Sequence, residues 1–178
     1  MTKVRWMAVF GWILWCVAGL APATATAAMT VVLGPDAAAC QSGTGGPAFL
    51  VHVYGIKRHT GVMRVQIYGD VPEHFLAPGK YLKRIDLPVV AEGTMDVCVA
   101  LPSTGQYVVS VRHDMNNDGK SDWNDGGGFS RNPNISLLHL RPKFKNVVIS
   151  ATGGVQLVEV VLNYRSGLSI GPIEEAKK

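Results

Sequence analysis

The sequence has no apolar run long enough to cross a bilayer as a helix. The longest, residues 6–20, holds about 15 residues, whereas a membrane-spanning helix needs roughly 20. It follows a short basic leader and precedes small residues with Ala-x-Ala sites ending at Ala25 and Ala27, which is typical of a secretory signal peptide. We therefore predict a signal peptide over residues 1–28, no membrane span after its removal, and a periplasmic or secreted protein. An uncleaved membrane anchor is the alternative.

Charged residues are sparse, at 17% of the chain, and neither sign dominates. Lys3 and Arg5 lie in the predicted leader, which leaves 15 basic side chains against 13 acidic ones. A nucleic-acid surface needs a basic stripe interleaved with aromatic residues. The basic residues are instead dispersed among turns and strand ends, so we predict a solvated face and no nucleic-acid partner. These residues are Lys57, Arg58, Lys80, Lys83, Arg84, Arg141, Lys143 and Lys145.

The common catalytic motifs are also missing, since there is neither a Gly-x-Ser-x-Gly elbow nor a His-Glu-x-x-His sequence. His113 beside Asp114, with Ser130, Ser136 and His139 downstream, supplies only the residue types of a nucleophile, a base and an orienting acid. We predict that His113 braces a loop through a hydrogen bond and that the protein is not an enzyme. A hydrolase-like site using His113 and Asp114 is the alternative.

Cysteine is rare, with three residues in the chain. Cys16 lies in the predicted leader, so Cys40 and Cys98 form an even pair in an exported protein. We predict a disulfide between Cys40 and Cys98. The alternative is a buried thiol at Cys98 and a free thiol at Cys40. The remaining residues, about 150, are enough for one domain with a single core.

No segment outside the leader has the period of a helix. Apolar residues instead alternate over short segments separated by Gly, Pro and Asn turns, which is typical of strands. The fold class predicted is all-β: a single antiparallel β-sandwich, immunoglobulin-like or transthyretin-like, over residues 29–165, with a flexible tail over 166–178. The expected strands are residues 49–54, 62–68, 81–87, 95–101, 106–113, 146–151 and 156–164.

Alternation also predicts which side chains fill the core. The first two strands, residues 49–54 and 62–68, are expected to form a hairpin. The inward-facing residues expected on three strands are Met63, Val65 and Ile67, then Val97, Val99 and Leu101, and then Tyr107, Val109 and Val111.

Residues 114–125 carry oxygen-bearing side chains at places 1, 3, 5, 9 and 12 of a twelve-residue loop, with Gly119 at the sixth place. That spacing is typical of a calcium loop. Because Asp ends the loop where Glu is usual, we expect a weak site with a Kd on the order of 0.1 to 1 mM. An Asx-rich turn that caps its own backbone amides is the alternative. The predicted ligands are Asp114, Asn116, Asp118, Asp122 and Asp125 through their side chains, and Lys120 through its backbone carbonyl.

The same long loop carries Trp123, Phe129 and Arg131 on a glycine-rich segment. Exposed aromatic residues on such loops stack on sugar rings or pack into a partner protein. We therefore predict that these three residues bind a cell-envelope glycan or protein. The alternative is that Trp123 and Phe129 fold back and plug the open end of the sandwich.

Three short sequences in order carry a resemblance: Gly-x-Tyr ending at Tyr107, His-Asp-x-Asn-x-Asp-Gly from His113, and Gly-Phe-Ser from Gly128. Over roughly residues 49–164 the chain resembles the bacterial domain of unknown function 2141 family. The resemblance implies an exported β domain without an assigned activity. Asp118 departs from the family's common Asn and adds negative charge to the loop. The family motif maps onto Tyr107, His113, Asp114, Asn116, Asp118, Gly119, Asp122, Gly128, Phe129 and Ser130.

Together these patterns predict an exported, non-catalytic binding or structural module of the cell envelope, stabilised by calcium in residues 114–125.

Overall fold

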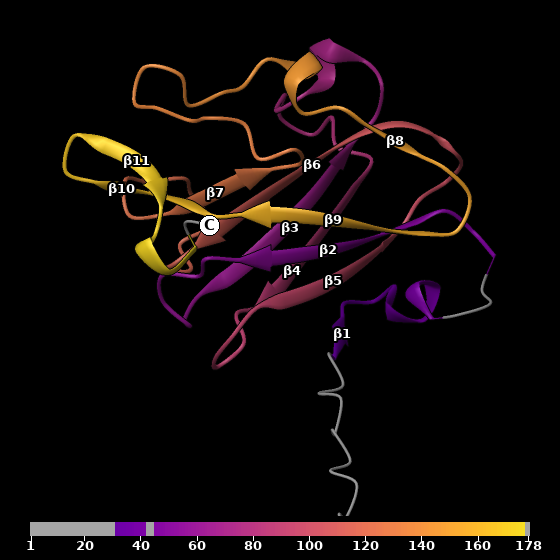
Figure 1. Cartoon of the computed structure of the whole chain (residues 1–178), viewed down its shortest axis with the longest axis horizontal. Helices are drawn as coiled ribbons and strands as arrows, with labels where there is room; N and C mark the ends of the chain where they lie inside the picture. Colours follow the sequence, from indigo (N-terminus) through magenta and orange to yellow (C-terminus); the bar gives the residue numbers. More distant parts are fainter. Residues whose placement is uncertain (1–30, 42–44, 177–178) are drawn as a thin grey trace, which may run out of the picture.

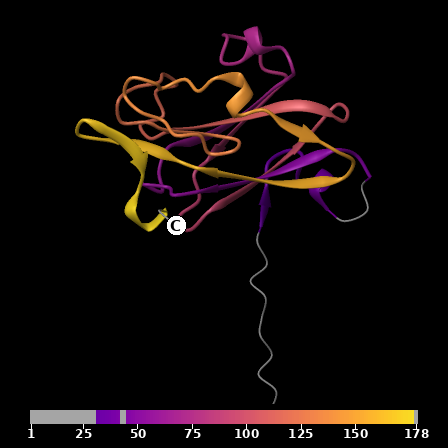
Figure 2. The same ribbon diagram turned by 45° about the horizontal axis from the view of Figure 1, so that its top comes forward.

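The computed structural model describes residues 31–41 and 45–176, so the predicted signal peptide lies outside the described residues. No helix in these described ranges is long and apolar enough to cross a membrane. The chain is all-β, as predicted, and its strands form two sheets that pack face to face (Figures 1 and 2).

The smaller sheet is mixed, not antiparallel as predicted. β2 pairs antiparallel with β5 but parallel with β9, and β1 pairs parallel with β5. A tight turn can join only antiparallel neighbours. Residues 55–154 separate β2 from β9 and include five strands of the other sheet, so the chain can re-enter the smaller sheet from the same end. The strand order is β1 (Val32–Leu33), β5 (Met95–Ala100), β2 (Ala48–Tyr54) and β9 (Val155–Val161).

The larger sheet contains seven strands, and all of its pairs are antiparallel. Six of them follow the order β11 (Ser169–Pro172), β10 (Asn163–Ser166), β7 (Gly126–Phe129), β6 (Gly105–Asp114), β3 (Val62–Tyr68) and β4 (Lys83–Pro88). The seventh, β8 (Ile149–Ala151), pairs with the start of β6.

The predicted hairpin between residues 49–54 and 62–68 is wrong, because β2 and β3 lie in different sheets. Both strands have an apolar inner face, and packing these faces against each other buries more apolar surface than pairing the strands edge to edge would. Residues 55–61 therefore form a corner between the sheets. Gly61 makes this corner possible, since its φ is +80° and an added Cβ would lie 2.1 Å from the backbone oxygen of Asp114.

The main core fills the space between the sheets, and it confirms the predicted inward faces. All nine residues predicted on the strands of Met63, Val97 and Tyr107 are exposed by 8% or less and belong to one cluster. Phe49, Val51 and Val53 of β2 complete this cluster from the opposite sheet.

A second, smaller cluster lies on the outer face of the seven-stranded sheet. Tyr68 and Val108, which are paired on β3 and β6, pack there with Phe129 and Val147, and Phe75 covers them. The outer face thus has an apolar end near Tyr68 and a polar end near the other terminus of β3. Figure 2 shows the long orange loops lying on this side of the molecule.

Part of the segment predicted as a flexible tail is regular. β11 forms a hairpin with β10, and the turn η4 (Glu174–Ala176) follows it. The predicted strand over residues 156–164 is divided, because β9 belongs to one sheet and β10 to the other. At the crossing point Leu162 is fully buried and donates its N–H to the carbonyl of Tyr54.

A disulfide joins Cys40 and Cys98, as predicted. Cys40 ends the short helix η1 (Ala37–Cys40), and Cys98 lies fully buried in β5. Beside it, the carboxylate of Asp36 accepts the N–H of Ala100 and pairs with Lys83. The amino-terminal segment is therefore fastened to both sheets.

Reduction of this disulfide is expected to lower the free energy of unfolding by about 4 kcal/mol, since it frees a loop with a sequence separation of 58 residues in the unfolded chain. Urea unfolding with and without reductant measures the loss. The double variant Cys40→Ser/Cys98→Ala is the control, because its unfolding curve should not respond to reductant. Identical curves for the wild type in both conditions would contradict the prediction.

Candidate functional site

The loop over residues 114–125 leaves the end of β6 and folds around its first side chain. The two carboxylate oxygens of Asp114 accept the N–H groups of Asp118 and Gly119, at 3.2 and 2.9 Å. Asp118 in turn accepts the N–H of Lys120 at 2.8 Å, and Asp122 accepts that of Asn124 at 2.7 Å. Short polar side chains of this kind fix tight turns by such bonds.

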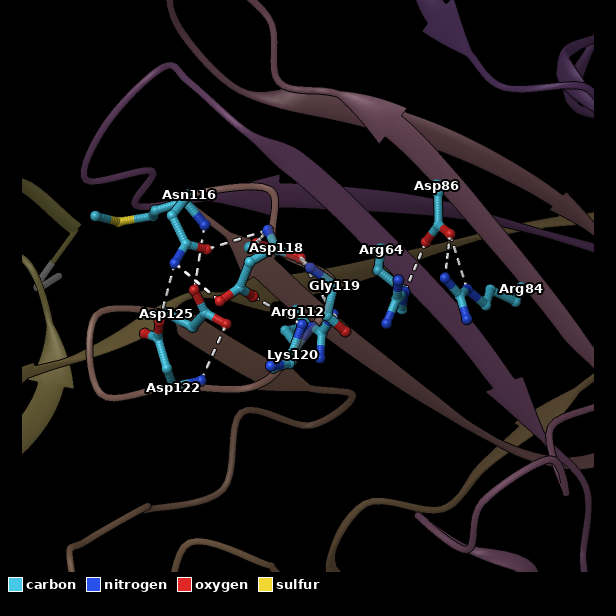
Figure 3. Close-up of polar contacts among 12 residues, drawn as sticks. Arg64, Arg84, Asp86, Arg112, Asn116, Asp118, Gly119, Lys120, Asp122 and Asp125 are labelled. Carbon is cyan, nitrogen blue, oxygen red and sulfur yellow. Dashed lines mark hydrogen bonds and ion pairs between the residues drawn. The ribbon is translucent and has the colours of Figure 1, made fainter.

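The loop closes on its last residue, Asp125. Its two carboxylate oxygens accept the N–H groups of Met115 and Asp122, at 3.2 and 3.3 Å. Burial raises the pKa of Asp125, and the neighbouring carboxylates of Asp122 and Asp114 raise it further, against the two amide bonds that lower it. The first and last carboxylates thus hold the two ends of the loop together (Figure 3).

The amide of Asn116 joins two of the acidic residues of the loop. Its Nδ2 donates to one oxygen of Asp118 and one of Asp122, both at 3.1 Å, and so lies between two carboxylates. Among residues 31–41 and 45–176 no group of three or more His, Cys, Asp or Glu side chains is arranged to hold a metal ion. The arrangement of the six predicted metal ligands is therefore that of a self-capped turn, and calcium binding stays a prediction.

Arg112 attaches the loop to the sheet. Its Nη2 donates to the carboxylate of Asp114 at 3.3 Å and to the carbonyl of Gly119 at 3.1 Å. Its Nε is buried and has no hydrogen-bond partner in the described part of the chain. A buried donor without a partner is uncommon and costs free energy. The hydrogen-bonding capacity of the Arg112 guanidinium is therefore only partly used.

His113 lies on the opposite face of β6 from Asp114 and is fully buried. One ring nitrogen, Nε2, lies 2.8 Å from the carbonyl of Thr60, which can only accept, so Nε2 carries the proton. Nδ1 therefore accepts the hydroxyl of Tyr164, at 2.7 Å. The Tyr164 oxygen also accepts the N–H of Lys57. This arrangement braces the corner between the sheets, as predicted for His113.

The other residues of the hydrolase alternative lie apart from His113. Ser130 is fully buried and donates its hydroxyl to the carbonyl of Val147 at 2.5 Å. Ser136 and His139 face each other at 3.5 Å in an exposed loop. No nucleophile, base and acid of the predicted set are brought together within the described residues.

A groove of about 840 Å³ lies over the outer face of the seven-stranded sheet and extends from its polar end to Tyr68 and Phe129 of the smaller apolar cluster. Its floor comes from β3, β6 and β7, and residues of the loop between Gly119 and Asp125 form one wall. Five arginines line it: Arg64, Arg84, Arg112, Arg141 and Arg165. Two acidic residues, Asp122 and Asp125, also line it, but their oxygens accept hydrogen bonds from their own loop.

The three predicted ligand-binding residues are separated. Trp123 is 64% exposed, lines the groove, and has the guanidinium of Arg165 stacked 4.4 Å from its ring centre. Phe129 lines the same groove but is 8% exposed and packs against Phe75 in the smaller cluster on the outer face of the seven-stranded sheet. Arg131 lies at a second, smaller cavity and donates to the carbonyl of Lys145.

The comparison with protein families identifies the family of the chain. The model of a family described as an uncharacterized protein conserved in bacteria (DUF2141) matches residues 51–159. The chain belongs to this family. The matched region begins in β2, ends in β9, and contains β3, β4, β6, β7 and the whole loop over residues 114–125. Searches of curated proteins and of solved structures found no significant match to this DUF2141 chain.

Sequence reasoning missed the arginines of the groove. Arg84 and Arg141 were assigned to a dispersed solvated face, and Arg64 and Arg112 were assigned to no site. The available signal was strand alternation, because Arg64 and Arg112 occupy the polar face of strands whose other face is apolar. Their meeting depends on the pairing of β3 with β6, which alternation does not reveal.

His113 predicts a pH dependence of stability. Burial lowers its pKa in the folded state, although the bond to Thr60 and the carboxylates of Asp125 and Asp114 raise it in part. Below about pH 6.5 the imidazole of His113 therefore binds a proton more readily in the unfolded chain than in the folded chain. We expect the free energy of unfolding to fall as the pH falls from 8 to 5, and His113→Gln to show a shallower fall.

Urea unfolding of both proteins at four pH values in this range measures these slopes. His74→Gln, which changes an exposed histidine, is the matched control and should keep the wild-type slope. Parallel slopes for the wild type and His113→Gln would show that His113 does not account for the dependence.

Proposed function

We propose that this DUF2141 chain is an exported, non-catalytic binding module of the bacterial cell envelope, and that a glycan or a partner protein occupies its groove. The observation that carries the proposal is the groove itself. Its volume of about 840 Å³ is that of a ligand site, and its walls combine exposed Trp123 with polar groups such as Gln66 and Asn163.

The chemistry of the groove supports binding in preference to catalysis. No histidine or cysteine is among its described lining residues. Both ring nitrogens of His113 are engaged on the other side of the sheet, with Tyr164 and Thr60. A hydrolase using His113 and Asp114 would have to break these bonds before the imidazole could act as a base.

Export and envelope location rest on the predicted leader over residues 1–28. They agree with the disulfide, which is stable in an oxidising compartment. We also propose that the sandwich is of the immunoglobulin-like or transthyretin-like type. Such folds present ligand-binding loops at one end.

Calcium is the cofactor that we propose for the loop. Support comes from the folding of the loop around Asp114, whose two oxygens take the amides of the fifth and sixth loop residues. A cation would replace the Asn116 amide nitrogen between Asp118 and Asp122, and would neutralise carboxylates that now share one neutral donor. Its role would be to hold the groove wall that carries Trp123.

Filling the groove should abolish binding. Gly127 faces the groove, and an added Cβ there would meet only the backbone oxygen of Val111 at an ordinary 3.7 Å. We expect the wild type to co-sediment with purified peptidoglycan sacculi and Gly127→Leu to bind at least about tenfold more weakly.

The matched control is Gly153→Leu, which adds the same side chain in open space outside the groove and should bind like the wild type. Circular dichroism and thermal melts of both variants establish that they are folded. Sedimentation of a folded Gly127→Leu protein at the wild-type level would place binding elsewhere.

Calcium at 10 mM should raise the Tm of the wild type by about 3 to 10 °C relative to chelator, if the Kd is on the order of 0.1 to 1 mM. Asp118→Ala should lose this rise. Asp118→Asn keeps an oxygen that can accept the Lys120 amide but removes the charge, so it should keep the turn and lose most of the calcium response. Equal melts in calcium and chelator for the wild type would leave the loop as a self-capped turn.

A further inference from the structure

The floor of the groove places two arginines side by side. Arg64 on β3 and Arg112 on β6 are directly paired in register, and both face away from the core, since Met63, Val65, Val111 and His113 next to them are buried. Like charges directly opposite each other in an antiparallel pair are destabilising. An anion between the two guanidiniums would remove this repulsion.

The carboxylates that bind this pair are Asp86, opposite Arg64 on β4, and Asp114, two residues beyond Arg112 on β6. Arg64 donates its Nε to Asp86 at 2.7 Å, and Arg112 donates to Asp114 at 3.3 Å. Asp86 is shared, because Arg84 also donates to its second oxygen, at 2.8 and 2.5 Å. Burial raises the pKa of Asp86, but the bonds from Arg84 and Arg64 outweigh it and hold the pKa low. Three guanidiniums thus share two carboxylates, and Figure 3 shows Asp86 between Arg64 and Arg84.

Some donors of these two arginines have no partner among the described residues. Arg64 is held in place, with 13% of its side chain exposed, yet only its Nε has a partner among the described residues. The Nε of Arg112 is buried without any partner in that part of the chain. Guanidinium groups fixed in this way bind planar oxyanions without losing much conformational freedom.

Gly127 leaves space beside this pair. The neighbouring Gly126 and Gly128 are required by packing, since an added Cβ would lie 2.3 Å from the Tyr164 ring and 2.5 Å from the Val161 oxygen. At Gly127, which pairs with Arg112 and lines the groove, packing would allow a side chain. Its missing side chain is what keeps the floor next to Arg112 open.

We infer that the groove binds a carboxylated carbohydrate, with one ligand carboxylate lying between Arg64 and Arg112 and a sugar ring against exposed Trp123. This inference rests on the proposed function and names the ligand class of the same site. Asp86 supplies the precedent within the molecule, because its carboxylate already bridges two arginines of neighbouring strands, Arg64 and Arg84.

The other lining groups favour a carbohydrate as the carrier of the carboxylate. Trp123 and Tyr81 provide exposed aromatic surface, and Gln66 and Asn163 provide amides that can exchange hydrogen bonds with hydroxyl groups. The groove is lined by five arginines, so it suits a chain that carries several carboxylates.

The test is calorimetric titration of the full chain with an oligogalacturonate and with its methyl ester, which has the same rings but no charge. We expect the acid to bind and the ester to bind at least about tenfold more weakly. Arg64→Gln should weaken binding of the acid to a similar extent. Arg58→Gln, which removes the same charge from an exposed turn outside the groove, should bind within about twofold of the wild type.

Gly127→Leu separates failure of the inference from failure of the proposed function. Equal binding of acid and ester, both blocked by Gly127→Leu, would overturn the carboxylate assignment and leave a binding groove for neutral glycans. If the protein bound phosphatidylglycerol vesicles or dextran sulfate but not the oligogalacturonate, the ligand would be another anion, and the assignment to a carboxylated carbohydrate would be wrong. Absence of binding to every probe, together with absence of binding to sacculi, would overturn both.

Discussion

The register between β3 and β6 is the constraint on which the rest of the structure depends. With Arg64 opposite Arg112, the inner faces of both strands are apolar, and the outer faces carry the charges of the groove. If β3 shifted by one residue against β6, Arg64 would turn into the core, and Met63 and Val65 would become exposed. The desolvation of an unpaired arginine in such a core would cost far more than the repulsion between Arg64 and Arg112 at the surface.

Local features of the chain were predictable because they depend on nearby residues. Alternation placed Met63, Val97 and Tyr107 with their strand neighbours in the core. The Asx-rich turn given as the alternative to a calcium loop describes the bonds that Asp114 accepts from its own loop. The Cys40–Cys98 bond followed from the count of cysteines and from the predicted export. Each of these inferences needs only periodicity or composition.

Strand partners were not predictable, because pairing is decided by which surfaces become buried. A short connection suggested that β2 and β3 pair, but burial of both inner faces places them in separate sheets. The groove was missed for the same reason. Arg64, Arg84 and Arg112 lie at least 20 residues apart and become neighbours only through the order β4–β3–β6.

The parallel pairing of β2 with β9 has a consequence for how the chain reaches this structure. The first pair of residues, Ala48 and Val155, closes a loop of more than 100 residues, whereas the β3–β4 pair closes a short one. Because entropy is lost before such distant contacts form, folding of this topology is slow and completes from the carboxyl-terminal part of the chain. A chain that is synthesised from its amino terminus would therefore leave one edge of β2 without its β9 partner until residues 155–161 have been made. Until then this edge presents free N–H and C=O groups, to which a strand of another chain could add.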